Sequence, residues 1–225
     1  MPSSQYYHIS KIMEMIISLK PNSVLDIGSG YGKFGVLCRE YLELWDGRQK
    51  YEFKKRIDCV EVFKEYITPL HKYIYNNIYN NNILDLVTNL DYRYDLVLLI
   101  DVLEHFEKKE GSDLLKTLVK NNNGVLISTP KKPSPQKDAF GNIYETHRSR
   151  WVNNELRIIG ECYFIDDSVS LICYMSKDKG SIHEFKKKLT DLKNHGKSSF
   201  KKTIKKTIIR MPGALATYKK IKHRQ

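Results

Sequence analysis

Short, almost wholly apolar runs alternate with amphipathic segments through residues 1–176, and this alternation limits the possible folds more than any other feature. The clearest runs are SVLDIG (23–28), RIDCVEV (56–62), YDLVLLIDVL (94–103) and GVLISTP (124–130). Strand-length runs separated by helical segments are typical of βαβ units around a parallel sheet. Because the runs are nearly continuously apolar, we expect helices to cover both faces of that sheet.

The remaining segments complete this prediction. Apolar residues at helical spacing predict helices over 9–19, 33–45, 63–79, 111–121 and 148–160. ILDLV (83–87) is expected to be a weak third strand, and WDGRQKYEFKK (45–55) a loop. Residues 161–176 are expected to form two strands joined by a turn at Asp166–Asp167. A hairpin at this point places one antiparallel strand in an otherwise parallel sheet.

The net charge of +12 is concentrated at one end of the chain. Residues 177–225 contain 16 of the 38 Lys and Arg residues but only three of the 26 acidic residues. Residues 1–176 therefore contain 22 basic and 23 acidic side chains and are nearly neutral. We expect a folded body over 1–176 and a basic extension over 177–225, whose functions are to be argued separately.

A glycine-rich turn, Asp26-Ile-Gly-Ser-Gly-Tyr-Gly32, follows the first strand and precedes a helix. Glycine at 28, 30 and 32 lets the main chain approach a ligand closely, and the helix start presents free N–H groups. A tight strand-to-helix turn can also need glycine for steric reasons alone. The dinucleotide pattern G-x-G-x-x-G requires glycine where Lys33 stands, which counts against an oxidoreductase with a nucleotide cofactor.

Glu61 closes the second strand, where its carboxylate can accept hydrogen bonds from both hydroxyls of a ribose. It lies further from the glycine turn than the usual interval of about 20 residues, and the insert over 45–55 explains the excess. A solvent-facing strand end is the alternative. Ligands of open α/β sheets bind at the carboxyl ends of the strands, which favours a ligand role for Glu61.

The segments VLDIGSGYGKFG and YDLVLLIDVLEHF, with the acidic end of the second strand, resemble the class I S-adenosylmethionine-dependent methyltransferases. The resemblance covers residues 9–176. The continuation STPKKPSPQKDAFGNIYETHRSRW is similar to a bacterial and archaeal subgroup with poorly assigned substrates. This resemblance implies an α/β, Rossmann-like, doubly wound sheet of seven strands in the order 3-2-1-4-5-7-6, with strand 7 antiparallel. The hairpin inferred independently over 161–176 agrees with that order.

The resemblance also implies S-adenosyl-L-methionine as cofactor and suggests where each part of it binds. Asp26 and the glycine-turn main chain would hold the methionine end, Glu61 the ribose, and Val62 or Phe63 would line the adenine. Asp101 and Val102 would face the sulfonium. Asp85 would meet the adenine amino group, with an ordinary loop carboxylate as an equal alternative. The implied cofactor residues are Asp26, Gly28, Ser29, Gly30, Gly32, Glu61, Val62, Asp85, Asp101 and Val102.

Methyl transfer depends chiefly on holding the acceptor in line with the methyl group, and a general base helps only when the acceptor atom carries a proton. The candidate bases are His147 and His105, which follow strands at the carboxyl edge of the sheet. The alternatives are a helix-entry role for His147 and a loop-organising role for His105. Tyr144, Glu145 and Arg148 are weaker candidates for substrate contact.

Residues 131–145 form a long, proline-interrupted loop, which is expected to act as a lid over the substrate. No metal site is expected, because Asp101, Glu104 and His105 have no second ligand cluster at a defined spacing.

The basic extension repeats apolar residues at helical spacing, first at Ile182, Phe185, Leu189 and Leu192, then after Gly196 at Phe200, Ile204 and Ile208. Such a helix can pack on the body, lie on an anionic membrane surface or bind nucleic acid. Nucleic acid is the weakest of the three, because the aromatic interleaving needed for base stacking is missing.

Together these observations predict an S-adenosylmethionine-dependent methyltransferase that modifies a small-molecule or sugar-like acceptor, by O-methylation. A non-catalytic cofactor-binding or membrane-adaptor module is the second hypothesis, and a nucleotide-cofactor oxidoreductase the third. The sequence lacks a bilayer-length apolar run and a secretion-signal pattern. The four cysteines lack metal-site spacing and are expected to be reduced. We therefore expect a cytoplasmic protein, with peripheral attachment to a membrane as an option.

Overall fold

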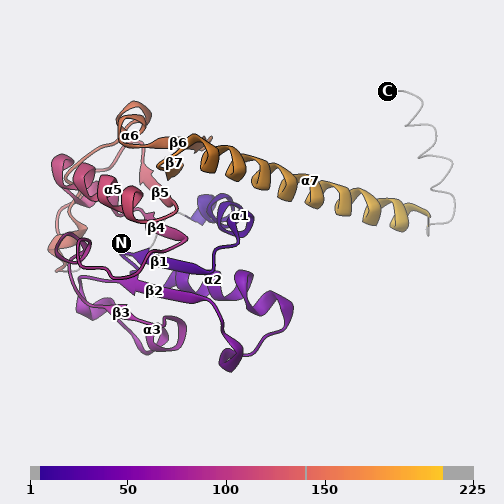
Figure 1. Cartoon of the computed structure of the whole chain (residues 1–225), viewed down its shortest axis with the longest axis horizontal. Coiled ribbons are helices and arrows are strands. Elements are labelled where there is room, and N and C mark those ends of the chain that lie inside the picture. Colours follow the sequence, from indigo (N-terminus) through magenta and orange to yellow (C-terminus); the bar gives the residue numbers. More distant parts are fainter. Residues whose placement is uncertain (1–5, 140, 210–225) are drawn as a thin grey trace.

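A seven-stranded sheet forms the centre of the computed structural model, which describes residues 6–139 and 141–209 (Figure 1). The strand order is β3-β2-β1-β4-β5-β7-β6. Strand β7 is antiparallel to both of its neighbours, and the other pairs are parallel. The predicted order and the antiparallel hairpin are confirmed. The strands are β1 (Ser23–Ile27), β2 (Arg56–Val60), β3 (Ile78–Tyr79), β4 (Leu96–Ile100), β5 (Val125–Pro130), β6 (Glu161–Ile165) and β7 (Ser170–Ser176).

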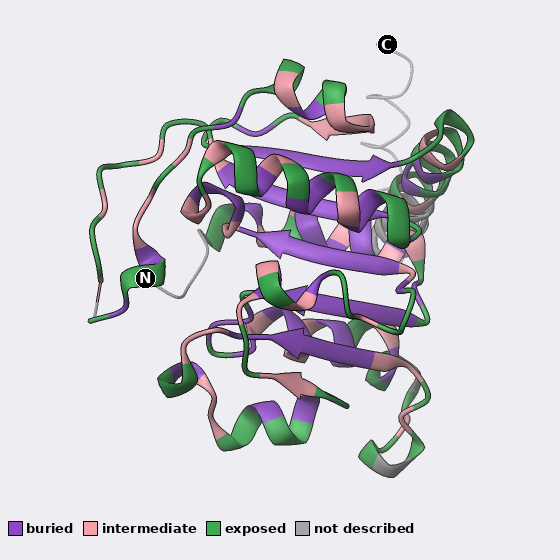
Figure 2. Cartoon of the chain, turned by 60° about the vertical axis from the view of Figure 1, so that its left-hand side comes forward, coloured by how far each residue is buried: buried purple, intermediate pink, exposed green. Residues whose placement is uncertain are grey.

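The helices lie on both faces of the sheet. Figure 2 shows β1, β2, β4, β5 and β7 as mostly buried, whereas the edge strands β3 and β6 are of intermediate burial. Side chains alternate between two cores: Val97 and Leu99 of β4 face one core, whereas Leu96 and Leu98 face the other. Helices α5 and α6 cover the first core, and α1, α2, α3 and α7 cover the second. The helices are α1 (Ile9–Leu19), α2 (Lys33–Leu42), α3 (Pro69–Ile74), α4 (Ile83–Leu86), α5 (Lys108–Asn121), α6 (Asn153–Ile159) and α7 (Lys179–Ile209).

The segment between β2 and β4 differs most from its prediction. The helix expected over 63–79 is only the six-residue α3, which begins at Pro69, and its last residues form β3 instead. Proline suits the first turn of a helix but ends any helix that enters it from the N-terminal side. The strand expected over 83–87 is the short helix α4, because the Asn82 side chain caps it by accepting a hydrogen bond from Leu84 N–H at 3.0 Å.

Within its described residues the extension forms one helix, α7, which continues through Gly196 and leaves the body in Figure 1 as a long projection. Near its start, Phe185 and Leu189 are buried in the second core, so this part of the extension is packed on the body. The predicted apolar positions Phe200, Ile204 and Ile208 lie outside the side chains that the structure describes. Over residues 6–139 and 141–209, no helix is both long and apolar enough to cross a membrane.

Candidate active site

A cavity of about 360 Å³ opens at the carboxyl edge of the sheet, beside the ends of β1 and β4. The strand order reverses between these two strands, and this is the usual ligand position in open α/β sheets. The volume lies within the range of small-molecule sites. Its walls come from the glycine turn, the ends of β2 and β4, α4, and the 3-10 turns η5 (Leu103–His105) and η6 (Ile143–Glu145).

The glycine turn forms one wall of the cavity. Gly28, Gly30 and Gly32 all have positive φ angles, of 68°, 53° and 84°. A Cβ atom on Gly28 would lie 2.5 Å from Val102 Cγ2, so any side chain here would collide with the loop after β4. Ser29 and Gly30 line the cavity, whereas Gly32 lies outside its lining and begins α2. Gly32 therefore shapes the turn, and the structure does not place it as a direct ligand contact.

Glu61 lies in the cavity wall and is 4% exposed. Its carboxylate accepts hydrogen bonds from Gly30 N–H at 2.8 Å and from Phe63 N–H at 3.0 Å. Burial raises the pKa of Glu61 to about 7. The carboxylate thus faces the glycine turn rather than bulk water, as a ribose-binding role requires, and Val62 lines the cavity beside it.

Two aspartates lie at the ends of β1 and β4. Asp26 is buried, accepts a hydrogen bond from the Tyr75 hydroxyl at 2.6 Å, and has its pKa raised to about 6 by burial. Asp101 has a positive φ of 55°, and its carboxylate accepts a hydrogen bond from the Ser128 hydroxyl at 2.8 Å. Nε2 of the buried His8 lies 3.5 Å from the same carboxylate. Asp26, Asp101 and Val102 all line the cavity.

The placement of Asp85 differs from its implied role. Asp85 lies on α4, is exposed, and is absent from the cavity lining. The cap on α4 instead turns Asn82 and Leu84 towards the cavity. The implied contact with adenine assumed a strand end at this point, and the helix removes that geometry.

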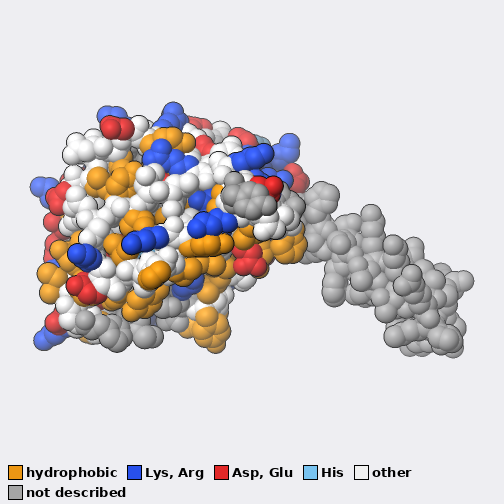
Figure 3. Space-filling view, turned by 90° about the horizontal axis from the view of Figure 1, so that it is seen from below, with side chains coloured by type: hydrophobic (Ala, Val, Ile, Leu, Met, Phe, Trp, Pro, Cys, Tyr) orange, Lys and Arg blue, Asp and Glu red, His pale blue; other side chains and the backbone are white. Residues whose placement is uncertain are grey.

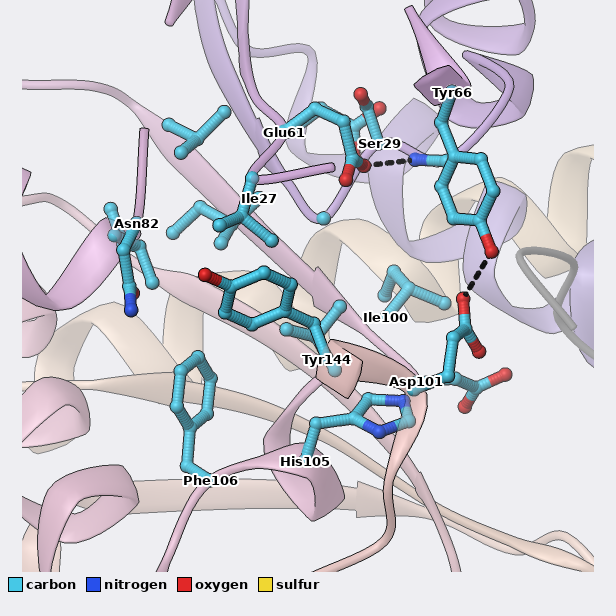
Figure 4. Close-up of a pocket in the computed structure, with 18 of the residues that line it drawn as sticks. Ile27, Ser29, Glu61, Tyr66, Asn82, Ile100, Asp101, His105, Phe106 and Tyr144 are labelled. Carbon is cyan, nitrogen blue, oxygen red and sulfur yellow. Dashed lines mark hydrogen bonds between the residues drawn. The ribbon is translucent and has the colours of Figure 1, made fainter. Parts of the chain in front are cut away.

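The loop after β5 lies across the cavity. In Figure 4 the ring of Tyr144 lies near the middle of the labelled side chains, with its hydroxyl on the side of Asn82. Glu145, the next residue, is 8% exposed and accepts a hydrogen bond from the Tyr66 hydroxyl at 3.1 Å. Gln136 Nε2 donates a hydrogen bond to the main-chain oxygen of Glu145 at 2.7 Å. The loop therefore forms part of the cavity wall, and its role as a lid over the substrate stays a prediction.

The two candidate histidines lie side by side, with ring centroids 5.1 Å apart. His105 Nδ1 is hydrogen-bonded to Thr146 O at 3.2 Å, and His147 Nδ1 to Ser134 O at 2.7 Å. In both rings Nδ1 must carry the proton, which leaves Nε2 as an acceptor. Burial lowers the pKa of His105, so its imidazole is neutral at pH 7. His105 lines the cavity, whereas His147 is absent from its lining.

Several residues of the site were not predicted from the sequence. Tyr66 holds the loop, and His71 Nε2 donates a hydrogen bond to Gly30 O at 3.0 Å, which supports the glycine turn. Both residues lie in the segment that was expected to be one continuous helix. Recognising Pro69 as a helix start would have placed them near the strand ends, where side chains meet ligands.

Comparison with known proteins identifies the family. The sequence matches the family described as "Methyltransferase domain" over residues 5–168. No curated protein matches it significantly.

Solved structures with the same fold include an O-methyltransferase family protein from Burkholderia thailandensis, with a TM-score of 0.54, 13% identity, and coverage of 76% of this chain and 55% of that one. The chain thus spans about half the length of the Burkholderia protein. The N-terminal domain of EvdMO1 with SAH bound gives a TM-score of 0.53 at 14% identity, over 78% and 83% of the two chains. An S-adenosylmethionine-dependent methyltransferase from Archaeoglobus fulgidus gives a TM-score of 0.51 at 20% identity, with coverage of 70% of this chain and 71% of that one.

These likenesses confirm the fold, and the family match removes the oxidoreductase hypothesis. The cofactor is S-adenosylmethionine, and a buried carboxylate at Glu61 beside an open glycine turn is consistent with it. The chain is a methyltransferase and belongs to the class I S-adenosylmethionine-dependent family.

Proposed function

We propose that this methyltransferase modifies a hydroxyl oxygen of a small-molecule or sugar-like acceptor. The observation that carries the proposal is the pair His105 and His147, whose Nδ1 atoms are held by main-chain carbonyls so that each Nε2 can accept a proton. Methyl transfer to an amine or a carbanion makes less use of such a pair, whereas a hydroxyl must lose its proton during attack.

Each group of the site then has one task. The bound cofactor supplies a methyl group on a sulfonium, which departs as a neutral thioether. Glu61 and the glycine turn hold the sugar and amino-acid parts, and Asp101 with Val102 borders the position of the sulfonium. His105, which lines the cavity, takes the hydroxyl proton at Nε2 in the absence of any other activating group. Tyr144, and the loop that is hydrogen-bonded to Tyr66 through Glu145, exclude water from the reacting atoms.

The proposal is tested by measuring S-adenosylhomocysteine formation with matched acceptors that carry a hydroxyl, an amine or a thiol at the same position. We expect turnover with hydroxyl acceptors only. Glu61→Ala should weaken cofactor binding by about 10-fold or more, because a charge-assisted contact is lost. Asp113→Asn, an exposed change on α5, is the matched control. Transfer to amines with no transfer to hydroxyls would contradict the proposal.

We also propose that α7 contacts an anionic lipid surface, at the cytoplasmic face of a membrane. Lys186, Lys187 and Lys193 are exposed on this helix, whereas the face of the body in Figure 3 shows basic side chains separated by hydrophobic and neutral ones. Each base near an anionic surface contributes about 1 kcal/mol. Flotation with anionic vesicles, but not with neutral ones, is the expected result, and equal flotation with both would refute the proposal. Retention on RNA with no flotation would favour the nucleic-acid alternative.

A further inference from the structure

Three side chains with metal-binding atoms meet beside the cavity: Glu104, His105 and His147. One potential ligand atom from each lies within 4.8 Å of the other two. Glu104 and His105 follow β4, and His147 comes from the loop after β5. Two main-chain hydrogen bonds to Glu104 O, from Arg148 N–H at 2.8 Å and Ser149 N–H at 3.0 Å, bring the two segments together.

The two imidazoles are oriented as metal ligands usually are. A ligating histidine typically donates its second N–H to a carbonyl or carboxylate, which fixes the ring and selects the tautomer. His105 and His147 both have Nδ1 paired with a main-chain carbonyl oxygen, of Thr146 and Ser134 respectively. Both Nε2 lone pairs are therefore available for an ion, and the rings are already held in place.

The carboxylate gives an independent observation. Glu104 is 1% exposed, and its Oε2 has no hydrogen-bond partner within the described part of the chain. Leaving such a buried oxygen unpaired is costly for the folded protein. The methyl-transfer scheme above gives Glu104 no task, so neither folding nor the proposed chemistry accounts for it, whereas a cation would satisfy this oxygen.

We propose that Glu104, His105 and His147 bind one divalent transition-metal ion of the Zn²⁺, Co²⁺ or Mn²⁺ class. Two imidazoles and one carboxylate suit these ions better than Mg²⁺ or Ca²⁺, which take mainly oxygen ligands. Three protein ligands leave coordination positions open for other oxygens. The sequence argument against a metal site considered Asp101 as the third ligand, and the fold provides His147 instead.

The ion would also activate the acceptor hydroxyl, in a step that rests on the proposed function. A hydroxyl bound to the ion has a lowered pKa and releases its proton to water. The resulting oxygen then forms the new C–O bond as the C–S bond breaks, and the electron pair of that bond goes to sulfur. The open coordination positions favour acceptors with two neighbouring hydroxyls. The two histidines then act as ligands rather than as proton acceptors.

The test begins with metal binding, which does not depend on any acceptor. The chelator-treated full chain is titrated with Co²⁺, whose visible absorption reports coordination by nitrogen and oxygen, and with Zn²⁺ by calorimetry. We expect one ion per chain, with affinity at least about 10-fold lower in Glu104→Gln and His147→Gln. Asp113→Asn is the control for surface carboxylates. Circular dichroism checks that each variant is folded, and His105→Gln provides a second variant at the site.

The outcomes separate the two proposals. Binding of one ion that is lost in the site variants supports the metal inference, whether or not a hydroxyl acceptor is found. Binding that is absent, or unchanged in folded site variants, overturns it. If the metal-free protein methylates hydroxyl acceptors as fast as the protein supplied with Co²⁺ or Zn²⁺, the activating role of the ion is overturned and the histidine-base form of the proposed function remains. Metal binding without transfer to any hydroxyl contradicts the proposed function alone.

Discussion

At the scale of single residues, the protonation state of Glu61 affects the stability of the free protein and, in the proposed ribose-binding role, the affinity for cofactor. Its burial favours the neutral carboxyl, with a pKa of about 7 against the ordinary 4.5. The folded state therefore binds this proton more tightly than the unfolded state, and Glu61 lowers stability as the pH rises from about 4.5 to about 7. Ribose hydroxyls that donate to the carboxylate favour the opposite, ionised form.

Because burial favours the neutral Glu61 carboxyl and ribose binding favours the ionised one, cofactor affinity should depend on pH. Binding should tighten as the pH rises through about 7, by up to roughly 10-fold between pH 6 and pH 8, and should release a proton at the lower pH. In Glu61→Gln the step between pH 6.5 and 8 should disappear, while a smaller dependence from Asp26 remains below about pH 6. Calorimetry with S-adenosylhomocysteine in buffers of different ionisation enthalpy measures both quantities. An unchanged step in Glu61→Gln would show that another group titrates.

Gly28 offers a second prediction at this scale. Gly28→Ala combines a positive φ of 68° with a Cβ atom 2.5 Å from Val102 Cγ2, and should lower the free energy of unfolding by about 2–4 kcal/mol. Gly47 is the matched control, since its φ is 87° but no atom lies within 4 Å of the added Cβ. Gly47→Ala should lower it by only about 1 kcal/mol. Urea denaturation compares the two, and equal losses would exclude the collision with Val102 as the cause.

At the scale of elements, the strongly apolar strands β1, β2, β4 and β5 could be predicted because burial on both faces leaves a clear pattern. The segment from α3 to α4 could not, since a short apolar run such as ILDLV fits a strand or a helix equally well. Its outcome depends on the Asn82 cap. The glycine turn and Glu61 line the cavity at the predicted strand ends, and their contacts with the cofactor stay a prediction. The cluster of Glu104 with two histidines depends on main-chain contacts between distant segments, which local sequence does not reveal.

The hydrogen bond from the Tyr66 hydroxyl to Glu145, which fastens the loop after β5, can be tested by removing one oxygen atom. Tyr66→Phe loses the hydrogen bond to Glu145 and should speed cofactor dissociation several-fold, because the loop carrying Tyr144 opens more often. The effect on unfolding should be small, about 0.5–1.5 kcal/mol. Stopped-flow fluorescence measures the dissociation rate, and Tyr73→Phe on the exposed side of α3 is the control. Equal dissociation rates in both variants would mean that Tyr66 does not hold the loop.

At the scale of the whole molecule, the division between body and extension is less sharp than the charge suggests. Helix α7 begins at Lys179, close to the predicted boundary, yet Phe185 is 1% exposed and lies 4.4 Å from the ring of Tyr174, measured between centroids. The charge boundary and the packing boundary therefore differ. The positive charge comes from exposed lysines along α7, whereas the core includes the buried side chains Phe185 and Leu189 of the same helix.

Phe185→Ala should therefore lower the free energy of unfolding by about 3–5 kcal/mol, as expected for a large side chain removed from a core. Lys187→Ala, an exposed change two residues along the same helix, should alter it by less than about 0.5 kcal/mol. Chemical denaturation followed by tryptophan fluorescence measures both. A similarly small effect of Phe185→Ala would mean that α7 is an independent appendage of a complete body.

The loop after β5 carries both Tyr144, which closes the cavity, and His147, which completes the cluster with Glu104. If the cluster binds an ion as proposed, movement of this one segment would both close the cavity and complete the ligand set. We therefore expect an ordered mechanism, in which the methyl donor binds before the loop closes and the acceptor binds afterwards. Steady-state kinetics should accordingly show a sequential mechanism with the donor leading, and the donor alone should be spared from wasteful hydrolysis.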